Sequence, residues 1–142
     1  MEKVTVIVER GKGKGNFSCF SVESVQKCGF GGYGATAREA IEDCFTNLQE
    51  YKEMAAEKGE TFPDVEFDFR FDVGSFFDYY PIDVTAFARY IGMNASALRQ
   101  YVTALREPKR ETIEKIREGI DKLSRDLGQN LMVDRPTVAY VE

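Results

Sequence analysis

Apolar and polar side chains alternate along residues 65–73, and this pattern limits the possible folds more than any other in the chain. An alternation with a period of two puts every apolar side chain on one face of an extended strand. That face carries Val65, Phe67, Phe69, Phe71 and Val73. We therefore expect a sheet with one face buried against a helix, while the other face is wet or meets a partner.

The N-terminal residues predict the neighbouring strands. Residues 3–9 alternate in the same way and are rich in β-branched side chains, which favour strands. Residues 16–22 predict the returning strand of a hairpin, because glycines and lysines at 11–15 mark a flexible turn. Residues 23–34 are consistent with a short third strand that ends in a bend permitted by glycine.

The covering helix is expected at 36–58. Thr36 and Glu39 have the T-x-x-E spacing of a capping box, in which each side chain satisfies an otherwise unpaired backbone N–H. Gly59 is the natural stop. The apolar stripe at steps of three and four residues consists of Ala37, Ala40, Ile41, Cys44, Phe45, Leu48, Tyr51 and Ala55.

The rest of the chain is expected to be helical. Asp83 is expected to cap a short helix, Gly92 to reverse the chain in a left-handed conformation, and Asn94 to cap a second helix. Pro108 closes this unit, and a third helix is expected from about Arg110 to Gly128. A short helix, a glycine turn and a capped second helix have the spacing of a helix-turn-helix.

Charge also divides the chain. Residues 1–82 carry 9 Lys and Arg against 15 Asp and Glu, whereas residues 83–142 carry 10 against 9. Residues 89–117 hold seven basic and three acidic side chains. An acidic body joined to a locally basic segment favours two modules with different partners, although two solvated surfaces of one domain would give the same pattern.

The predicted fold class is α+β, with an N-terminal antiparallel sheet and one packed helix, followed by an all-α helix-turn-helix. An apolar run near the C-terminus favours an added edge strand or a bridge to a second subunit. The domains are 1–73 for the α/β part, 74–82 for an aromatic connector, 83–128 for the helix-turn-helix and 129–142 for a tail with a possible edge strand.

The run from Gly34 to Ile41, Gly-Ala-Thr-Ala-Arg-Glu-Ala-Ile, follows three predicted strands and opens the helix. In this arrangement the chain resembles the HicB antitoxin family over roughly residues 3–73. The resemblance implies a truncated, catalytically inactive ribonuclease-H-like sheet with one helix, and a toxin protein as partner.

The helical part resembles the Cro/repressor (Xre-type) helix-turn-helix family. The matching positions are Phe87-Ala88, Gly92-Met93-Asn94, Ser96, Leu98-Arg99-Gln100, Pro108 and Glu111-Thr112-Ile113 with Lys115-Ile116. Ala104 stands where that family often has a glycine at the end of the second helix. An ordinary three-helix unit that does not bind DNA is the alternative.

The resemblance implies that the second helix enters the major groove of double-stranded DNA with its N-terminal end at the base edges. Ala95, Ser96 and Gln100 then occupy base-reading positions, and Gln100 could make a bidentate contact with adenine. The residues expected at phosphates are Asn94, Arg99, Thr103, Arg106, Lys109 and Arg110. Because three base readers are few, we expect a homodimer or higher oligomer on a palindromic site.

Composition argues against most catalytic sites. The chain has no histidine and three cysteines without CxxC spacing, which removes Ser-His and Cys-His pairs and makes a zinc site or disulfide framework unexpected. No apolar run is long enough to cross a bilayer, and no signal peptide is recognisable, so we expect a cytoplasmic protein. No catalytic residue, cofactor or metal is predicted.

Two minor interpretations concern the first domain. The glycine-rich run at 29–34 could be a phosphate-binding loop, but it lacks the Gly-Lys-Ser/Thr continuation. Glu9, Glu66 and Asp68 could form the carboxylate cluster of a metal-dependent nuclease.

The leading hypothesis is a DNA-binding antitoxin that neutralises a small basic ribonuclease toxin and represses its own operon as a dimer. The alternative is a solo helix-turn-helix regulator whose N-terminal domain dimerises or senses a ligand.

Overall fold

The computed structural model describes residues 1–11, 16–129 and 132. The chain forms two compact units, at 1–107 and 108–142, and each is described by itself. The first unit holds a sheet and four helices, while the second holds helix α5 (Arg110–Gln129). The predicted tail strand within 129–142 lies almost wholly outside the described residues, as do the turn residues 12–15.

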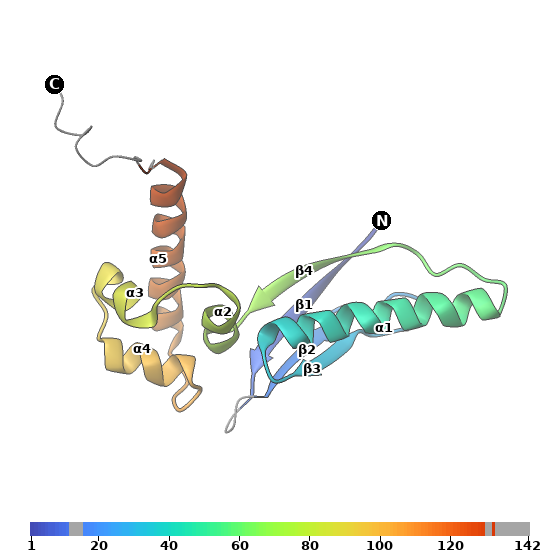
Figure 1. The fold of residues 1–142 in the computed structure, drawn as a ribbon, viewed down its shortest axis with the longest axis horizontal. Helices are drawn as coiled ribbons and strands as arrows, with labels where there is room; N and C mark the ends of the chain where they lie inside the picture. Colours follow the sequence, from blue (N-terminus) through green and yellow to red (C-terminus); the bar gives the residue numbers. More distant parts are fainter. Residues whose placement is uncertain (12–15, 130–131, 133–142) are drawn as a thin grey trace. The chain divides into compact units, whose positions relative to one another are not determined.

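The sheet has the strand order β3-β2-β1-β4 (Figure 1). The strands are β1 (Glu2–Arg10), β2 (Phe17–Ser21), β3 (Gly31–Gly34) and β4 (Val65–Phe71). β1 pairs antiparallel with β2, and β2 pairs antiparallel with β3. The hairpin and the short third strand predicted from the sequence are therefore confirmed.

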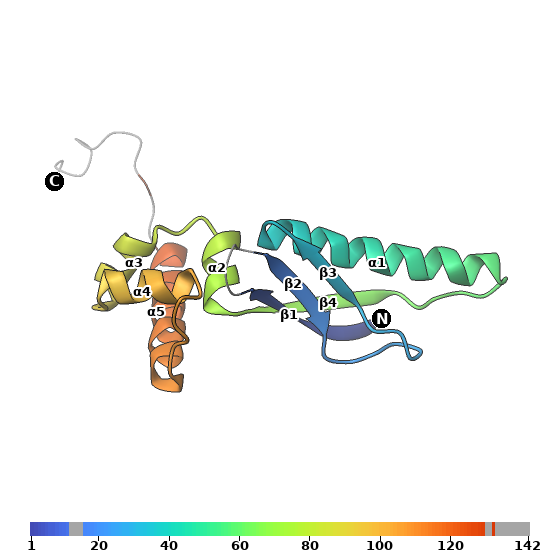
Figure 2. The ribbon, with the colours of Figure 1, turned by 90° about the horizontal axis from the view of Figure 1, so that it is seen from below.

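The prediction that the whole sheet is antiparallel was wrong, because β4 runs parallel to β1. Their register aligns Glu2 with Val65 and Val8 with Phe71. The chain leaves β3, returns through helix α1 (Ala37–Glu57) over one face, and enters β4 beside β1 in the same direction (Figure 2). The sheet is mixed because this helical crossover carries the chain back before β4 begins.

The core lies between the sheet and α1. Val4, Val6 and Val8 of β1 are buried on the face that α1 covers, as the alternation predicts. The helix contributes Ala37, Ala40, Ile41, Cys44 and Leu48. The phenylalanines of β4 are only partly buried against this core, and the edge of α1 meets them through Phe45, whose ring centroid lies 5.2 Å from that of Phe67.

Both predicted ends of α1 are confirmed. Thr36 accepts a hydrogen bond from the Glu39 N–H at 3.1 Å, and the Glu39 carboxylate accepts from the Ala35 N–H at 2.8 Å. Beyond the helix, Gly59 has φ 72°. Asp78, which is distant in sequence, adds a further cap because its carboxylate accepts from the Ala37 N–H at 2.8 Å.

The glycines of β3 allow α1 to pack directly on the strand backbone. A Cβ atom at Gly32 would lie 2.3 Å from the Ala40 carbonyl oxygen and 2.7 Å from the Cys44 nitrogen. At Gly31 the nearest atom would be at 3.4 Å, an ordinary contact. The glycine-rich run therefore has a packing role in the strand at Gly32.

The expected connector at 74–82 is largely a helix, α2 (Val73–Tyr79). Asp72 follows β4 and caps α2, since its carboxylate accepts from the Ser75 N–H at 2.9 Å. Val73, expected as the last strand residue, therefore belongs to α2. The aromatic residues pack as expected, and the Phe77 ring lies 5.4 Å from that of Phe87.

Candidate nucleic-acid interface

Two short helices carry most of the predicted DNA-binding residues. They are α3 (Val84–Ile91) and α4 (Ala95–Val102). Asp83 caps α3 by accepting from the Ala86 N–H at 3.0 Å, and Asn94 caps α4 by accepting from the Ala97 N–H at 2.9 Å. Both predicted caps are confirmed.

The turn between these helices needs glycine. Gly92 has φ 71° and ψ 34°, which is the left-handed conformation that the sequence predicts. Its N–H donates to the Arg89 carbonyl at 3.2 Å, and the Met93 N–H donates to the Ala88 carbonyl at 2.8 Å. These paired bonds close the end of α3 and start α4 after a three-residue turn.

A small apolar core holds α3 and α4 together. Phe87, Ala88 and Leu98 are buried, and Ala88 and Leu98 are fully enclosed. Helix α4 contacts both α3 and α2. This burial fixes which face of α4 points inward, so Ser96 and Arg99 lie on the exposed face.

The N-terminal end of α4 is accessible. Asn94 and Ser96 are exposed, and Ala95 is half-buried. Helix N-termini attract anions because their first N–H groups have no partner within the helix. This end therefore has both an exposed hydroxyl at Ser96 and a favourable position for a phosphate.

Gln100 lies on α4 one turn after Ser96 and is half-buried. Its side-chain oxygen accepts from the Arg106 guanidinium at 3.3 Å. The Arg106 guanidinium also lies over the Tyr101 ring, 5.4 Å from its centroid. Arg106 and Gln100 thus form one cluster, and a bidentate contact of Gln100 with adenine would have to share or displace this hydrogen bond.

Two predicted phosphate-binding residues differ in what they can offer. The Arg99 guanidinium donates to the Thr85 hydroxyl at 3.0 Å and is exposed, so it keeps donors for a phosphate. The hydroxyl of Thr103, the residue after α4, donates to the Arg99 carbonyl at 2.9 Å. In this conformation the hydroxyl hydrogen of Thr103 points into the helix and away from any phosphate.

Lys109 and Arg110 belong to the second unit and are exposed. Arg110 is the first residue of α5, and its Nε lies 3.6 Å from a carboxylate oxygen of Glu114. The predicted third helix is confirmed as an element, with bounds close to those expected.

The sequence interpretation missed a residue that positions α4. The Arg10 guanidinium, from the end of β1, donates to the carbonyl of Val102 at the last turn of α4, at 3.1 Å. Its Nε is buried with no hydrogen-bond partner among the described residues. Gly74 makes room, because a Cβ there would lie 2.8 Å from Arg10 and 2.9 Å from the Val102 oxygen.

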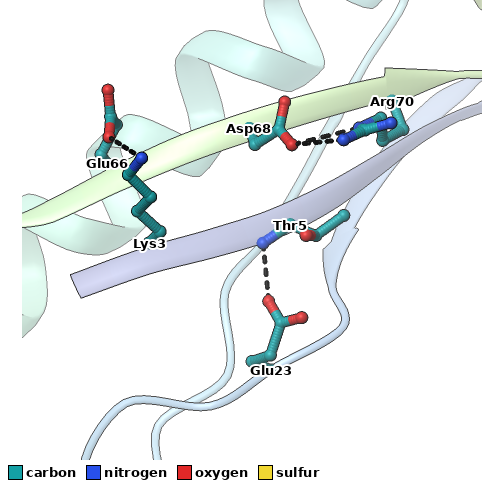
Figure 3. Close-up of polar contacts among 6 residues, drawn as sticks. All are labelled: Lys3, Thr5, Glu23, Glu66, Asp68 and Arg70. Atoms are coloured by element: carbon teal, nitrogen blue, oxygen red, sulfur yellow. Dashed lines mark hydrogen bonds and ion pairs between the residues drawn. The ribbon is translucent and has the colours of Figure 1, made fainter.

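The minor interpretations of the first domain gain no support from its hydrogen bonds. Glu66 pairs with Lys3 at 4.0 Å and Asp68 with Arg70 at 2.8 Å, on the polar face of the sheet (Figure 3). Within the described ranges, no group of three or more Cys, Asp or Glu side chains is placed to hold a metal ion. The N–H groups of Gly31 and Tyr33, which a phosphate loop would need, donate to side chains of α1.

The cysteines of the core are thiols of structural type. Burial is the main cause that raises the pKa of Cys19 to about 12 and that of Cys44 to about 11. Nearby charge on Asp43 raises both values further. Neither thiol is poised to act as a nucleophile near neutral pH.

No protein-family model, curated protein or solved structure matches the chain. Among the described helices, none combines the length and apolar character needed to cross a membrane.

Proposed function

We propose that the chain is the DNA-binding antitoxin of a HicAB-like toxin–antitoxin pair. It neutralises a small ribonuclease toxin and represses its own operon. The observation that carries the DNA-binding half is the arrangement of α3, the left-handed Gly92 and the Asn94-capped α4, whose N-terminal end is exposed. Three independent local features agree at the spacing of a helix-turn-helix.

The same proposal assigns each part of the fold to a fold family. Residues 1–73 form a HicB-like, truncated ribonuclease-H-like domain, and 83–128 form an Xre-type helix-turn-helix with α5 as its third helix. The mixed four-stranded sheet with one covering helix supports the first assignment, and the capped α3 and α4 support the second.

In this proposal α4 lies in the major groove. Ser96 and Gln100 contact base edges, Ala95 contacts a thymine methyl, and Arg99 binds a phosphate while Thr85 steadies its guanidinium. A homodimer doubles these contacts on a palindromic operator.

Charge supports the toxin-binding half. Residues 1–82 have an excess of six acidic side chains, and the outer surface of α1 exposes Glu42, Glu50, Glu53 and Glu57. An acidic surface favours the approach of a basic toxin. The resemblance of the first domain to HicB antitoxins is the reason for proposing a small ribonuclease as the toxin.

A gel-shift experiment with DNA from upstream of the chain's own gene tests the proposal. We expect a shifted band that weakens steeply with added salt, because binding releases counterions from the phosphates. Adding the small basic product of a neighbouring gene should change the mobility of that complex. A shift that no neighbouring protein alters would favour the solo regulator, and no shift would overturn the DNA-binding half.

A further inference from the structure

The two edges of the sheet differ in their backbone hydrogen bonding. At the β3 edge, α1 side chains accept from the backbone N–H groups that point outward. Three acceptors spaced four residues apart on α1 do this, at 2.8 to 3.0 Å. The pairs are Glu39 with the N–H of Ala35, Asp43 with Tyr33 and Asn47 with Gly31. This edge is closed to another strand.

The β4 edge is open. The Asp72 N–H donates to the Val8 carbonyl at 3.1 Å, and the Glu2 N–H donates to the Asp64 carbonyl at 3.0 Å. Even-numbered residues of β4 therefore bond to β1, and the backbone groups of Phe67 and Phe69 point away from it. No strand of the described residues pairs with this outer side.

The polar face of β4 has a self-complementary charge order. Glu66, Asp68 and Arg70 follow one another on this face, each exposed (Figure 3). If a second β4 ran antiparallel with Asp68 opposite Asp68, Glu66 would face Arg70 of the second copy, twice by symmetry. On the other face, Phe67 would lie opposite Phe69. Cross-strand Glu–Arg and Phe–Phe pairs stabilise antiparallel sheets. The two Asp68 carboxylates would repel each other at the axis, and the Arg70 guanidinium of the same strand, 2.8 Å from each, offsets that repulsion.

We propose that β4 pairs antiparallel with β4 of a second copy of this chain, about a two-fold axis at Asp68. This register overlaps the full strand, Val65–Phe71. This register also fits the alternation of hydrogen-bonded and non-hydrogen-bonded pairs in an antiparallel sheet. Phe67 and Phe69, whose backbone groups point outward, oppose each other as a hydrogen-bonded pair. The two Asp68 residues form a non-hydrogen-bonded pair. The two sheets become one continuous sheet across the axis.

This pairing goes beyond the proposed function because it needs neither DNA nor toxin. A sheet-mediated dimer would stand even if the gel-shift experiment failed. Conversely, a DNA-binding dimer whose association Arg70→Glu leaves unchanged would overturn the β4 pairing and leave the proposed function intact.

Charge reversal with rescue tests the pairing in the full chain by sedimentation equilibrium. Arg70→Glu alone and Glu66→Arg alone each place like charges opposite each other twice, so each should weaken one association step about tenfold or more. The double variant Glu66→Arg/Arg70→Glu restores opposite charges and should restore that step. Glu9→Arg makes the same charge change as Glu66→Arg, but on β1 and away from the open edge, and should leave association unchanged.

At protein concentrations where the chain is monomeric, all variants should unfold in urea like the wild type. The ion pairs that they break, Lys3–Glu66 and Asp68–Arg70, are exposed, and such pairs add little to stability.

Cross-linking tests the register in a Cys28→Ser background, where the remaining cysteines are buried. Asp68→Cys should form a disulfide dimer under mild oxidation, because Cα atoms of a non-bonded antiparallel pair lie about 4.5 Å apart. Arg70→Cys should not, because its two copies would be offset by about 13 Å along the strands.

Three outcomes would overturn the proposal. The first is equal association of wild type and Arg70→Glu. The second is a cross-link through Arg70→Cys in place of Asp68→Cys. The third is a wild-type chain that stays monomeric, whether or not this edge binds a different protein.

Discussion

At the scale of single residues, Ala104 holds a conformation that glycine prefers. It follows α4 with φ 62°. The Ala104 N–H donates to the Tyr101 carbonyl at 3.1 Å, and the Leu105 N–H donates to the Gln100 carbonyl at 2.9 Å. These two bonds define a Schellman motif, whose left-handed position is usually glycine. The backbone at Ala104 therefore adopts a turn that glycine would favour, although the residue is alanine.

Ala104→Gly should therefore stabilise the first unit, by about 1 kcal/mol, because alanine in the left-handed region has a steric cost that glycine avoids. Urea unfolding followed by circular dichroism measures the change. Ala97→Gly inside α4 is the matched control and should destabilise by about 1 kcal/mol. A loss of stability in Ala104→Gly would contradict the strain at this position.

Arg99 provides a test of phosphate binding. Arg99→Ala should weaken binding to all DNA sequences and lower the salt dependence of the affinity by about one phosphate contact. Fluorescence anisotropy at several salt concentrations measures this slope. Arg38→Ala, on the helix that covers the sheet, is the control and should leave the slope unchanged. An unaltered slope in Arg99→Ala would remove the residue from the interface.

Gln100 provides a test of base reading. Gln100→Ala should cost about 1–3 kcal/mol of binding free energy on the correct operator. The loss should be much smaller on an operator already altered at the base pair that Gln100 contacts. Binding titrations with a panel of single-base-pair variants identify that base pair. The variant also frees Arg106 from its hydrogen bond, so a uniform change on every sequence would assign Gln100 to positioning Arg106.

At the scale of elements, the close contact between α1 and β3 depends on Gly32. Gly32→Ala should destabilise the first unit by about 3 kcal/mol or more, because the new methyl group would meet helix backbone atoms that cannot move independently. Gly31→Ala, one residue away, has room and should cost much less. Denaturant unfolding of the pair measures the difference, and equal losses would show that β3 tolerates a side chain beneath α1.

Local signals in the sequence predicted most elements and their ends. The caps at Thr36, Asp83 and Asn94 and the turn at Gly92 involve neighbours in sequence, so residue type alone indicates them. The direction of β4 could not be predicted in this way, because alternation has the same period in parallel and antiparallel strands. Helix α2 was missed because the alternation continues past Asp72, which is in fact a cap.

The candidate site was predictable only in part. Spacing identified Asn94, Ser96 and Arg99, which the structure places on exposed surface of α4 or its cap. The residues that hold these helices in place are distant in sequence, so no local sequence pattern indicates them. Arg10 reaches α4 from the opposite end of the first unit's sequence, and Asp78 reaches the start of α1.

At the scale of the whole molecule, the chain has no histidine, so its stability near neutral pH does not depend on that side chain. The buried thiols affect stability at higher pH. In the folded state the pKa of Cys19 is raised from 9.0 to about 12 and that of Cys44 to about 11. Their contribution to stability is complete below pH 9, where both states are protonated, and is lost as the pH rises toward these values.

We therefore expect the free energy of unfolding to fall as the pH rises above about 9. Urea titrations at a series of pH values measure this, under reducing conditions. The double variant Cys19→Ala/Cys44→Ala removes both thiols, so its stability should fall less steeply over the same interval. Identical slopes for the variant and the wild type would show that other groups account for the alkaline loss.

The hydrogen bond from Arg10 to Val102 also bears on how the protein can be dissected. Anyone producing the sheet separately would be tempted to cut near Pro81, where the aromatic run ends. Such a fragment would lack the Val102 carbonyl that accepts the hydrogen bond from Arg10. The Arg10 guanidinium, which lies over the Phe17 ring, would then have lost this acceptor. A cut after Glu107 keeps this acceptor and follows the border of the first compact unit.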